Sequence, residues 1–83
     1  MTSGAGQPEE LTVSELGGRA RAALSALAGS TDLQAFRELL ALSEFAGECL
    51  GESARTLAAH GSWSQVAGVA GTTRQAAWSR WRA

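Results

Sequence analysis

The chain has 83 residues, a length that is enough for one small domain, and its net charge is −1. Its one cysteine, Cys49, excludes an intrachain disulfide and a cysteine-based zinc site, and no apolar run approaches the roughly 20 residues of a membrane span. The charges are segregated, since all eight acidic residues lie in the first 52 positions, whereas residues 53–83 hold four arginines and no acid. This asymmetry favours a polyanion-binding end.

The first 28 residues divide into a tail and a first helix. Residues 1–7 are small and mostly polar, so we expect a disordered tail with no secretion signal. From Pro8 to Ala28 the apolar residues recur at spacings of three and four, which predicts a helix with Pro8 in its first turn. The pair Gly17-Gly18 weakens this helix, so a break into two short helices there is the alternative.

A long helix is predicted next, from the capping box Thr31-Asp32-Leu33-Gln34 to about His60. Its apolar and small residues form two adjacent stripes. The first stripe follows alternating steps of three and four: Leu33, Phe36, Leu40, Ser43, Gly47, Leu50, Ala54 and Leu57. The second consists of Leu39, Leu42, Ala46 and Cys49, and Phe45 adds to the apolar surface.

One apolar stripe is enough to bury a helix against its own domain, so two stripes favour contact with a second subunit. We therefore predict that residues 8–60 form a dimerisation region. The expected interface of this homodimer consists of Phe36, Leu39, Leu40, Leu42, Phe45 and Leu50. Gly47 and Gly51 would let another backbone approach closely, and Cys49 is expected to be a buried small apolar residue. A monomer whose core wraps around the long helix is the alternative.

Residues 61–83 carry the pattern of two short helices joined by a turn. Gly61 follows His60, a helix-end cap, and Ser62-Trp63-Ser64-Gln65 is a second capping box that opens a helix from Trp63 to about Ala70. Gly71 ends it, and Thr72 or Thr73 opens another helix that runs to about Arg82. Such a pair with a glycine in a short turn is the helix-turn-helix arrangement.

Close crossing of these two helices requires a small residue, and Ala67 occupies that position four residues before Gly71. We expect inward positions at Val66, Ala70, Ala77 and Trp81, with Trp63 packed between the pair and the end of the long helix. Outward positions are expected on the second helix at Thr73, Arg74, Gln75, Trp78, Ser79 and Arg82. Trp78 has two interpretations, contact with a thymine methyl or sugar and completion of the core, of which we favour the core.

The stretch Ser62-Trp63-Ser64-Gln65-Val66-Ala67, followed by Gly71-Thr72-Thr73-Arg74-Gln75-Ala76-Ala77-Trp78, resembles the ending of many small actinobacterial helix-turn-helix DNA-binding proteins. The resemblance covers about 21 of the 83 residues. It implies that the second helix enters the major groove of double-stranded DNA. No stretch of the sequence is a convincing strand, so we expect an all-α domain with a long central helix, a C-terminal helix-turn-helix and no wing. Ala70 and Thr72 depart from the family, where Leu and Val are usual around the turn glycine.

The resemblance also implies roles for individual side chains between positions 61 and 83. Contacts to base edges are expected from Arg74, Gln75, Thr73 and Trp78, with Arg74 the first choice because arginine pairs with guanine. Phosphate contacts are expected from Ser62, Ser64, Thr72, Ser79, Arg80 and Arg82. A two-fold dimer would bind a short palindrome or two half-sites.

The sequence predicts neither an enzyme nor a cofactor or metal site. One histidine, one cysteine and scattered carboxylates provide no acid–base pair and no activated nucleophile. We expect a cytoplasmic protein of the nucleoid, either a transcriptional regulator or a nucleoid-associated protein, with no membrane or small-molecule substrate as partner. The alternative is a protein-interaction module that binds a sigma factor or a larger regulator through its long apolar helix. RNA binding ranks third among the hypotheses, because the chain lacks the sequence patterns of the common RNA-binding modules.

Overall fold

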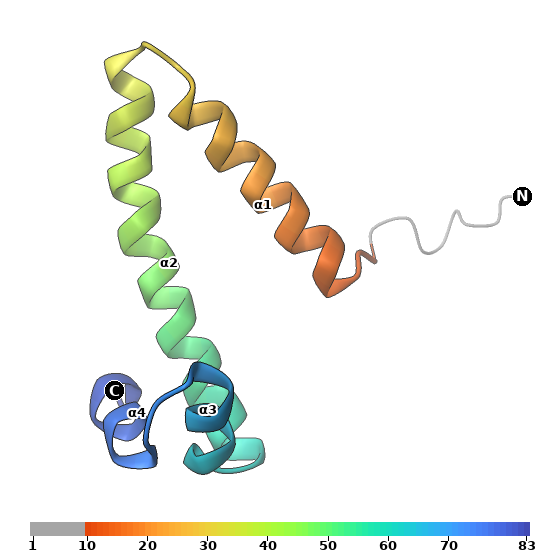
Figure 1. Cartoon of the computed structure of the whole chain (residues 1–83), viewed down its shortest axis with the longest axis vertical. Coiled ribbons are helices and arrows are strands. Elements are labelled where there is room, and N and C mark those ends of the chain that lie inside the picture. The colour runs from red at the N-terminus through yellow and green to blue at the C-terminus, as the bar shows by residue number, and fades with distance from the viewer. Residues whose placement is uncertain (1–9) are drawn as a thin grey trace, which may run out of the picture. The chain divides into compact units, whose positions relative to one another are not determined.

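The computed structural model describes residues 10–83, and this part of the chain is all-α, as predicted. Its four helices are α1 (Val13–Ala28), α2 (Leu33–His60), α3 (Trp63–Ala70) and α4 (Arg74–Trp81) (Figure 1). The predicted tail 1–7 and the helix-opening Pro8 lie outside the described residues. The chain divides into two compact units, one ending at Leu40 and the other comprising Ala41–Ala83, and α2 contributes to both.

Helix α1 begins later than the sequence pattern predicted. Glu10 to Thr12 precede the helix, and Thr12 is the N-cap, with its hydroxyl accepting from the Glu15 N–H at 3.0 Å. The Glu15 carboxylate in turn accepts from the Thr12 N–H at 2.8 Å. This reciprocal pair fixes the start of the helix at Val13, because it satisfies two N–H groups that have no carbonyl partner at a helix start.

The break considered at Gly17-Gly18 does not occur, since α1 is continuous to Ala28. Neither glycine has a positive φ, so both adopt the ordinary helical conformation. No residue of α1 is buried, and Val13 and Leu16 are largely exposed. The apolar face that the sequence pattern predicted for this helix therefore has no cover in its own unit.

The predicted capping box at the start of α2 is wrong by one residue. Asp32, not Thr31, caps the helix, because its Oδ1 accepts from the Gln34 N–H at 2.9 Å. The Ser30 hydroxyl accepts from the Asp32 N–H at 3.0 Å and holds the cap in place. A carboxylate is at least as good an N-cap as a threonine hydroxyl, so the helix starts at Leu33. Its end at His60 is as predicted, and His60 Nδ1 donates to the Thr56 carbonyl at 2.9 Å.

The turn between α3 and α4 depends on Gly71. Gly71 has φ 72° and ψ 34°, the left-handed conformation, and its N–H donates to the Ala67 carbonyl. The Thr72 N–H donates to the same carbonyl at 3.0 Å, which closes the end of α3. A residue with a Cβ adopts this conformation only at a cost, so glycine at this position lets the chain reverse between the two helices.

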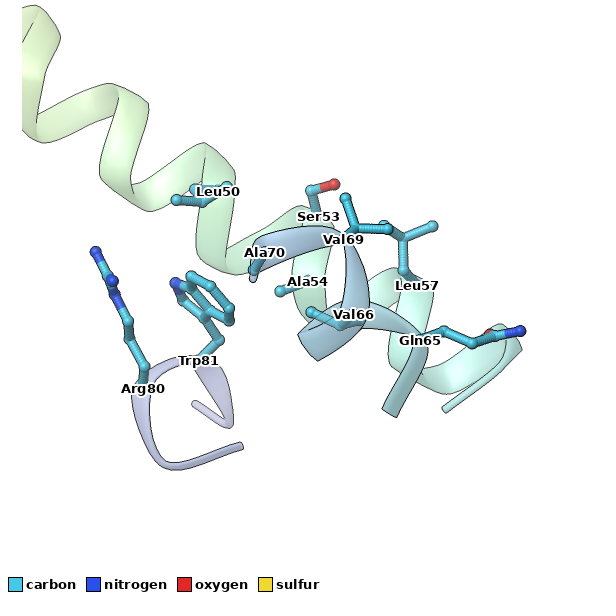
Figure 2. Close-up of a pocket in the computed structure, with 10 residues that line it drawn as sticks. All are labelled: Leu50, Ser53, Ala54, Leu57, Gln65, Val66, Val69, Ala70, Arg80 and Trp81. Atoms are coloured by element: carbon cyan, nitrogen blue, oxygen red, sulfur yellow. The ribbon is translucent and has the colours of Figure 1, made fainter. Parts of the chain in front are cut away.

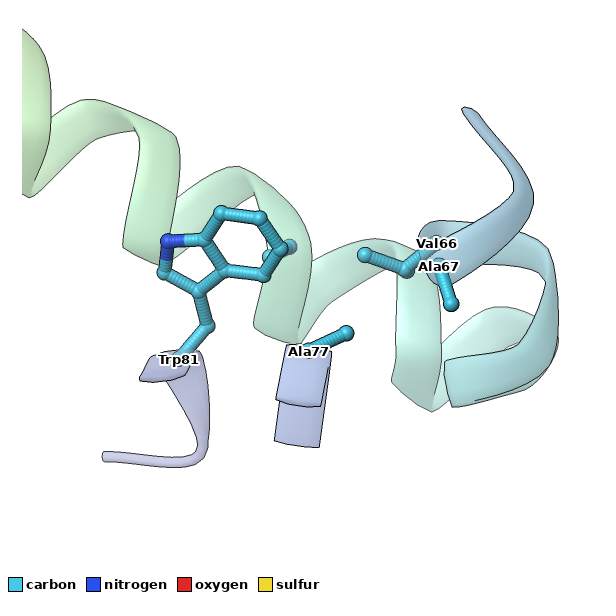
Figure 3. Close-up of a cluster of buried hydrophobic side chains, with 5 residues drawn as sticks. Val66, Ala67, Ala77 and Trp81 are labelled. Atoms are coloured by element: carbon cyan, nitrogen blue, oxygen red, sulfur yellow. The ribbon is translucent and has the colours of Figure 1, made fainter. Parts of the chain in front are cut away.

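Helices α3 and α4 pack on each other and on the C-terminal half of α2 around a small core (Figure 3). The buried residues of this core are Ala54, Val66, Ala67, Ala77 and Trp81, with Ala58 and Trp63 packed against them. Ala77 is completely buried and Ala67 is 3% exposed, so two alanines meet where α3 and α4 cross. The predicted inward position of Ala70 is wrong, since Ala70 is exposed one turn after Val66.

Two glycines of this unit provide a matched test of the turn. Gly71→Ala is expected to lower the free energy of unfolding by about 1–2 kcal/mol, because the left-handed conformation strains any L side chain. Gly68→Ala is expected to raise it by about 1 kcal/mol, since Gly68 is helical and a Cβ there meets nothing within 4 Å. Urea unfolding followed by circular dichroism measures both, and the same sign for both variants would contradict the turn geometry.

Candidate functional site

The α3–α4 pair is held by side-chain caps at both helix starts. The Ser62 hydroxyl accepts from the Gln65 N–H at 3.2 Å, which is one of the two hydrogen bonds of the predicted capping box. The Thr73 hydroxyl accepts from the Ala76 N–H at 3.1 Å, so Thr73 rather than Thr72 is the N-cap of α4. Each hydroxyl keeps its own hydrogen for donation to an outside acceptor.

One face of α4 points away from the core. Successive residues of an α-helix are turned by about 100°, so Gln75, Ser79 and Arg82 lie on the side opposite the buried Ala77 and Trp81. All three are exposed. Arg74 is also exposed because it is the first residue of α4, although it lies only about 20° from Trp81 around the helix axis. We call Gln75, Ser79 and Arg82, together with Arg74 at the start of the helix, the outer face of α4.

Trp78 belongs with the outer face and not with the core. Its side chain is 40% exposed and is absent from the buried cluster, so the favoured core position was wrong. The Arg82 guanidinium lies over its ring, 4.7 Å from the centroid, which is a cation–π contact. This contact holds Arg82 beside the indole at the exposed surface and leaves the rest of the ring edge accessible.

Arg80 is separated from the other predicted phosphate contacts of α4. It lies about 140° from Gln75 around the axis of α4, and its guanidinium is 5.1 Å from the centroid of the Trp81 ring. The same side chain lines an apolar groove on the other side of α4. The structure therefore does not bring Arg80 together with Ser79 and Arg82.

The remaining predicted phosphate contacts lie around the starts of the two short helices. Ser64 is exposed in the first turn of α3, and Thr72 is exposed in the turn before α4. Residues 53–83 contain Arg55, Arg74, Arg80 and Arg82 and no acid, so no carboxylate of that segment opposes an anion at this surface. Arg55 is already engaged, since its Nη1 donates to the Trp81 carbonyl at 3.0 Å and closes the end of α4.

A groove of about 640 Å³ lies between α2, α3 and α4. Figure 2 shows Leu50, Trp81 and Arg80 toward one end of it and Leu57, Val69 and Gln65 toward the other. Val69 is 93% exposed and Leu57 is 57% exposed, so the walls of the groove are largely uncovered apolar side chains. Val69 was not predicted to have a role, although an apolar residue outside the expected inner positions of α3 indicates an uncovered surface there.

The residues predicted for the dimer interface are accessible but do not all share one face of α2. Phe36, Leu40, Phe45 and Leu50 are exposed, whereas Leu39 and Leu42 are half-buried. Phe45 is turned by about 140° from Leu50 and lies on the side that carries Glu38 and Glu52. Cys49 is exposed, which corrects its predicted burial.

Comparison of the chain with protein-family models, curated proteins and solved structures found no match. Within residues 10–83, no helix combines the length and apolar character needed to cross a membrane. No group of three or more His, Cys, Asp or Glu side chains in the same residues is arranged to hold a metal ion. The geometry of the α3–α4 pair and the charges around it are therefore the evidence that bears on function.

Proposed function

We propose that this protein binds double-stranded DNA, with α3, the Gly71 turn and α4 acting as a helix-turn-helix. The observation that carries the proposal is the outer face of α4. It exposes two arginines, a glutamine and a serine beside a capped helix start, in a segment of 31 residues without an acid. Exposed cations and hydrogen-bond donors on one helix face are what contact with a phosphate backbone and base edges requires.

In this proposal α4 lies in the major groove and its first turn meets the bases. Arg74 is the principal base contact, since a guanidinium donates two hydrogen bonds to the O6 and N7 atoms of guanine. Gln75 pairs with an adenine in the same groove, and Trp78 and the Thr73 hydroxyl contribute contacts beside them. Ser62, Ser64, Thr72, Ser79 and Arg82 contact phosphates along the two strands.

One α3–α4 pair presents few contacts, so we propose that the protein acts as a homodimer. Two copies related by a two-fold axis would present two α4 helices to two half-sites. A small chain with a short site fits a nucleoid-associated protein slightly better than a regulator of single genes. Association of the protein with the nucleoid follows from either role.

Arg74→Ala tests this proposal. Duplexes selected by the unchanged protein from a pool of genomic fragments are titrated by fluorescence anisotropy with the protein and with the variant. Loss of the guanine contact is expected to weaken binding about tenfold to a hundredfold, because one bidentate pair contributes about 1–3 kcal/mol of discrimination. Arg19→Ala, which removes an exposed arginine of α1, is the matched control and is expected to change the affinity little.

The result that would contradict the proposal is equally specific. An unchanged protein that selects no fragment even at low salt, with its helicity intact by circular dichroism, would exclude DNA as the partner. Equal effects of Arg74→Ala and Arg19→Ala would show that binding depends on charge alone and not on the outer face of α4.

A further inference from the structure

The last turn of α4 is fixed to the rest of its unit by few contacts. Only two side chains of this helix, Ala77 and Trp81, are buried, and Trp81 is the one in the last turn. The same turn carries Trp78 and Arg82, which are joined by a cation–π contact at the exposed surface. The place from which these two residues meet a partner therefore depends on how the last turn is held.

A hydrogen bond from α2 holds this turn. The carbonyl groups in the last turn of a helix have no partner within the helix itself. The Trp81 carbonyl accepts from Arg55 Nη1 at 3.0 Å, although the two residues are 26 positions apart in the chain. The guanidinium also lies at the negative end of the α4 dipole, where a cation is favourable. This bond joins the end of α4 directly to α2.

Gly51 leaves the space in which the bond forms. It is buried and has no positive φ, so its backbone conformation does not require glycine. Figure 3 shows the Trp81 ring extending from α4 toward α2, and a Cβ on Gly51 would lie 3.8 Å from Cδ1 of that ring. The same Cβ would lie 3.2 Å from Arg55 Nη1, which is closer than an ordinary van der Waals contact. An alanine at position 51 would therefore press the guanidinium away from the carbonyl.

Other helical glycines of the same unit differ from Gly51 in this respect. A Cβ added to Gly47 or Gly68 meets nothing within 4 Å. A glycine in a helix interior is destabilising relative to alanine, and at position 51 the contacts of Arg55 and Trp81 give a reason for it. These side chains of the same chain cover Gly51, where the sequence pattern predicted the approach of another backbone.

Arg55 has a different environment from Arg82, although both are exposed cations of the acid-free segment 53–83. The Arg82 guanidinium lies over the exposed Trp78 ring, whereas Arg55 Nη1 points at the backbone of α4. Charge alone would place both among the phosphate contacts. The hydrogen bond instead gives Arg55 a role within the protein.

We propose that Arg55 is a positioning residue for DNA binding. Through the space left by Gly51 it holds the last turn of α4, and with it Trp78 and Arg82, in the place from which they contact DNA. Arg55 itself contacts no phosphate. This inference rests on the proposed function and deepens it, because it assigns to α2 the side chain that orients the DNA-contacting helix.

Arg55→Ala in the full chain tests the role by anisotropy titrations of the selected duplexes at several salt concentrations. The affinity is expected to fall about tenfold at every salt concentration, because the released turn and its side chains must be ordered when DNA binds. The slope of log affinity against log salt is expected to stay unchanged, since no phosphate contact is lost. Arg82→Ala, by contrast, should decrease the slope, and Arg19→Ala is the control that should change neither quantity.

A second substitution separates positioning from stability. When Gly51→Ala is added to Arg55→Ala, the new Cβ no longer meets a guanidinium and keeps its ordinary contact with the Trp81 ring. Alanine also favours the helix, so the urea midpoint should rise toward that of the unchanged protein. The DNA affinity of this double variant should remain about tenfold low, because the Trp81 carbonyl still lacks its partner.

The urea midpoints also test the contact between Gly51 and Arg55. Gly51→Ala is expected to raise the midpoint more in the Arg55→Ala background than in the unchanged chain, because only the unchanged chain has a guanidinium in the way. Gly68→Ala, whose Cβ meets nothing, is the matched control and should raise the midpoint equally in both backgrounds.

Three results would overturn the positioning role. They are an Arg55→Ala variant that binds DNA as tightly as the unchanged protein, a salt slope that decreases as it does for Arg82→Ala, and a double variant that regains affinity together with stability. The second result would make Arg55 a phosphate contact, and the third would limit it to stability. Failure of the DNA proposal gives a different pattern, in which the unchanged protein selects no duplex while the coupling between positions 51 and 55 in urea persists.

Discussion

Trp81→Ala is expected to unfold the α3–α4 pair. Trp81 is 9% exposed, and it and Val66 are the only residues larger than alanine in the buried cluster of the second unit. Removing a buried tryptophan side chain costs about 3–5 kcal/mol, which equals the whole stability that one small core usually supplies. The variant should therefore show a lower helix content by circular dichroism at 25 °C and no cooperative urea transition for this unit.

Trp78→Ala is the matched control, because it removes the same side chain three residues earlier in the same helix. Trp78 is 40% exposed, and its main contact within the chain is with the Arg82 guanidinium. A cation–π pair at an exposed site contributes about 0.5–1 kcal/mol, so the urea midpoint should move only slightly. Equal destabilisation by the two variants would contradict the placement of Trp81 inside and Trp78 outside.

The helix boundaries that were predicted correctly have local chemical causes. The end of α2 at His60, the whole of α3 and the turn at Gly71 follow from residues within four positions of each boundary. Ser62 caps its own helix, and Gly71 takes the left-handed conformation that ends one. Such signals act through hydrogen bonds and backbone conformation of neighbouring residues, so the sequence alone shows them.

The errors arose where two local signals competed or where burial depended on the tertiary structure. Thr12 caps α1, which starts later than predicted, and Asp32 rather than Thr31 caps α2. The apolar pattern does not specify which of several polar residues near a helix start becomes the cap. Trp78, Ala70 and Cys49 have apolar side chains, and the sequence pattern placed each inside. Their exposure reflects which side of each helix another element covers, and helical spacing does not contain that information.

The sequence predicted which residues of α4 are exposed cations, but not that they lie on different sides of the helix. The sequence pattern grouped Arg80 with Arg82 as phosphate contacts because both are cations on one helix. The structure places Arg82 over the exposed Trp78 and Arg80 beside the groove, over Trp81. Residues two positions apart in a helix differ by about 200° around its axis, so Arg80 and Arg82 lie on nearly opposite sides of α4.

This division leads to the second large effect, a steep dependence of DNA affinity on salt. With Arg80 on the groove side of α4, each subunit presents two cations to DNA, Arg74 and Arg82, so the proposed dimer presents four. Arg82 neutralises a phosphate, and Arg74 displaces counterions from the major groove in which it binds guanine. Each cation that displaces counterions contributes about −0.9 to the slope of log affinity against log salt, which predicts a slope of about −3.6. The affinity is then expected to fall about a hundredfold between about 50 and about 200 mM salt.

The arginine variants show which side chains produce that slope. Arg82→Ala removes two charges from the dimer, so the slope should decrease to about −1.8, and anisotropy titrations at four salt concentrations measure it. Arg80→Ala, measured at protein concentrations where the dimer is intact, should leave the slope near −3.6, because its guanidinium lies on the groove side of α4. A decrease of the same size for both variants would return Arg80 to the DNA-binding surface. A slope near zero for the unchanged protein would mean that no counterions are released, and the outer face of α4 would then have no phosphate partner.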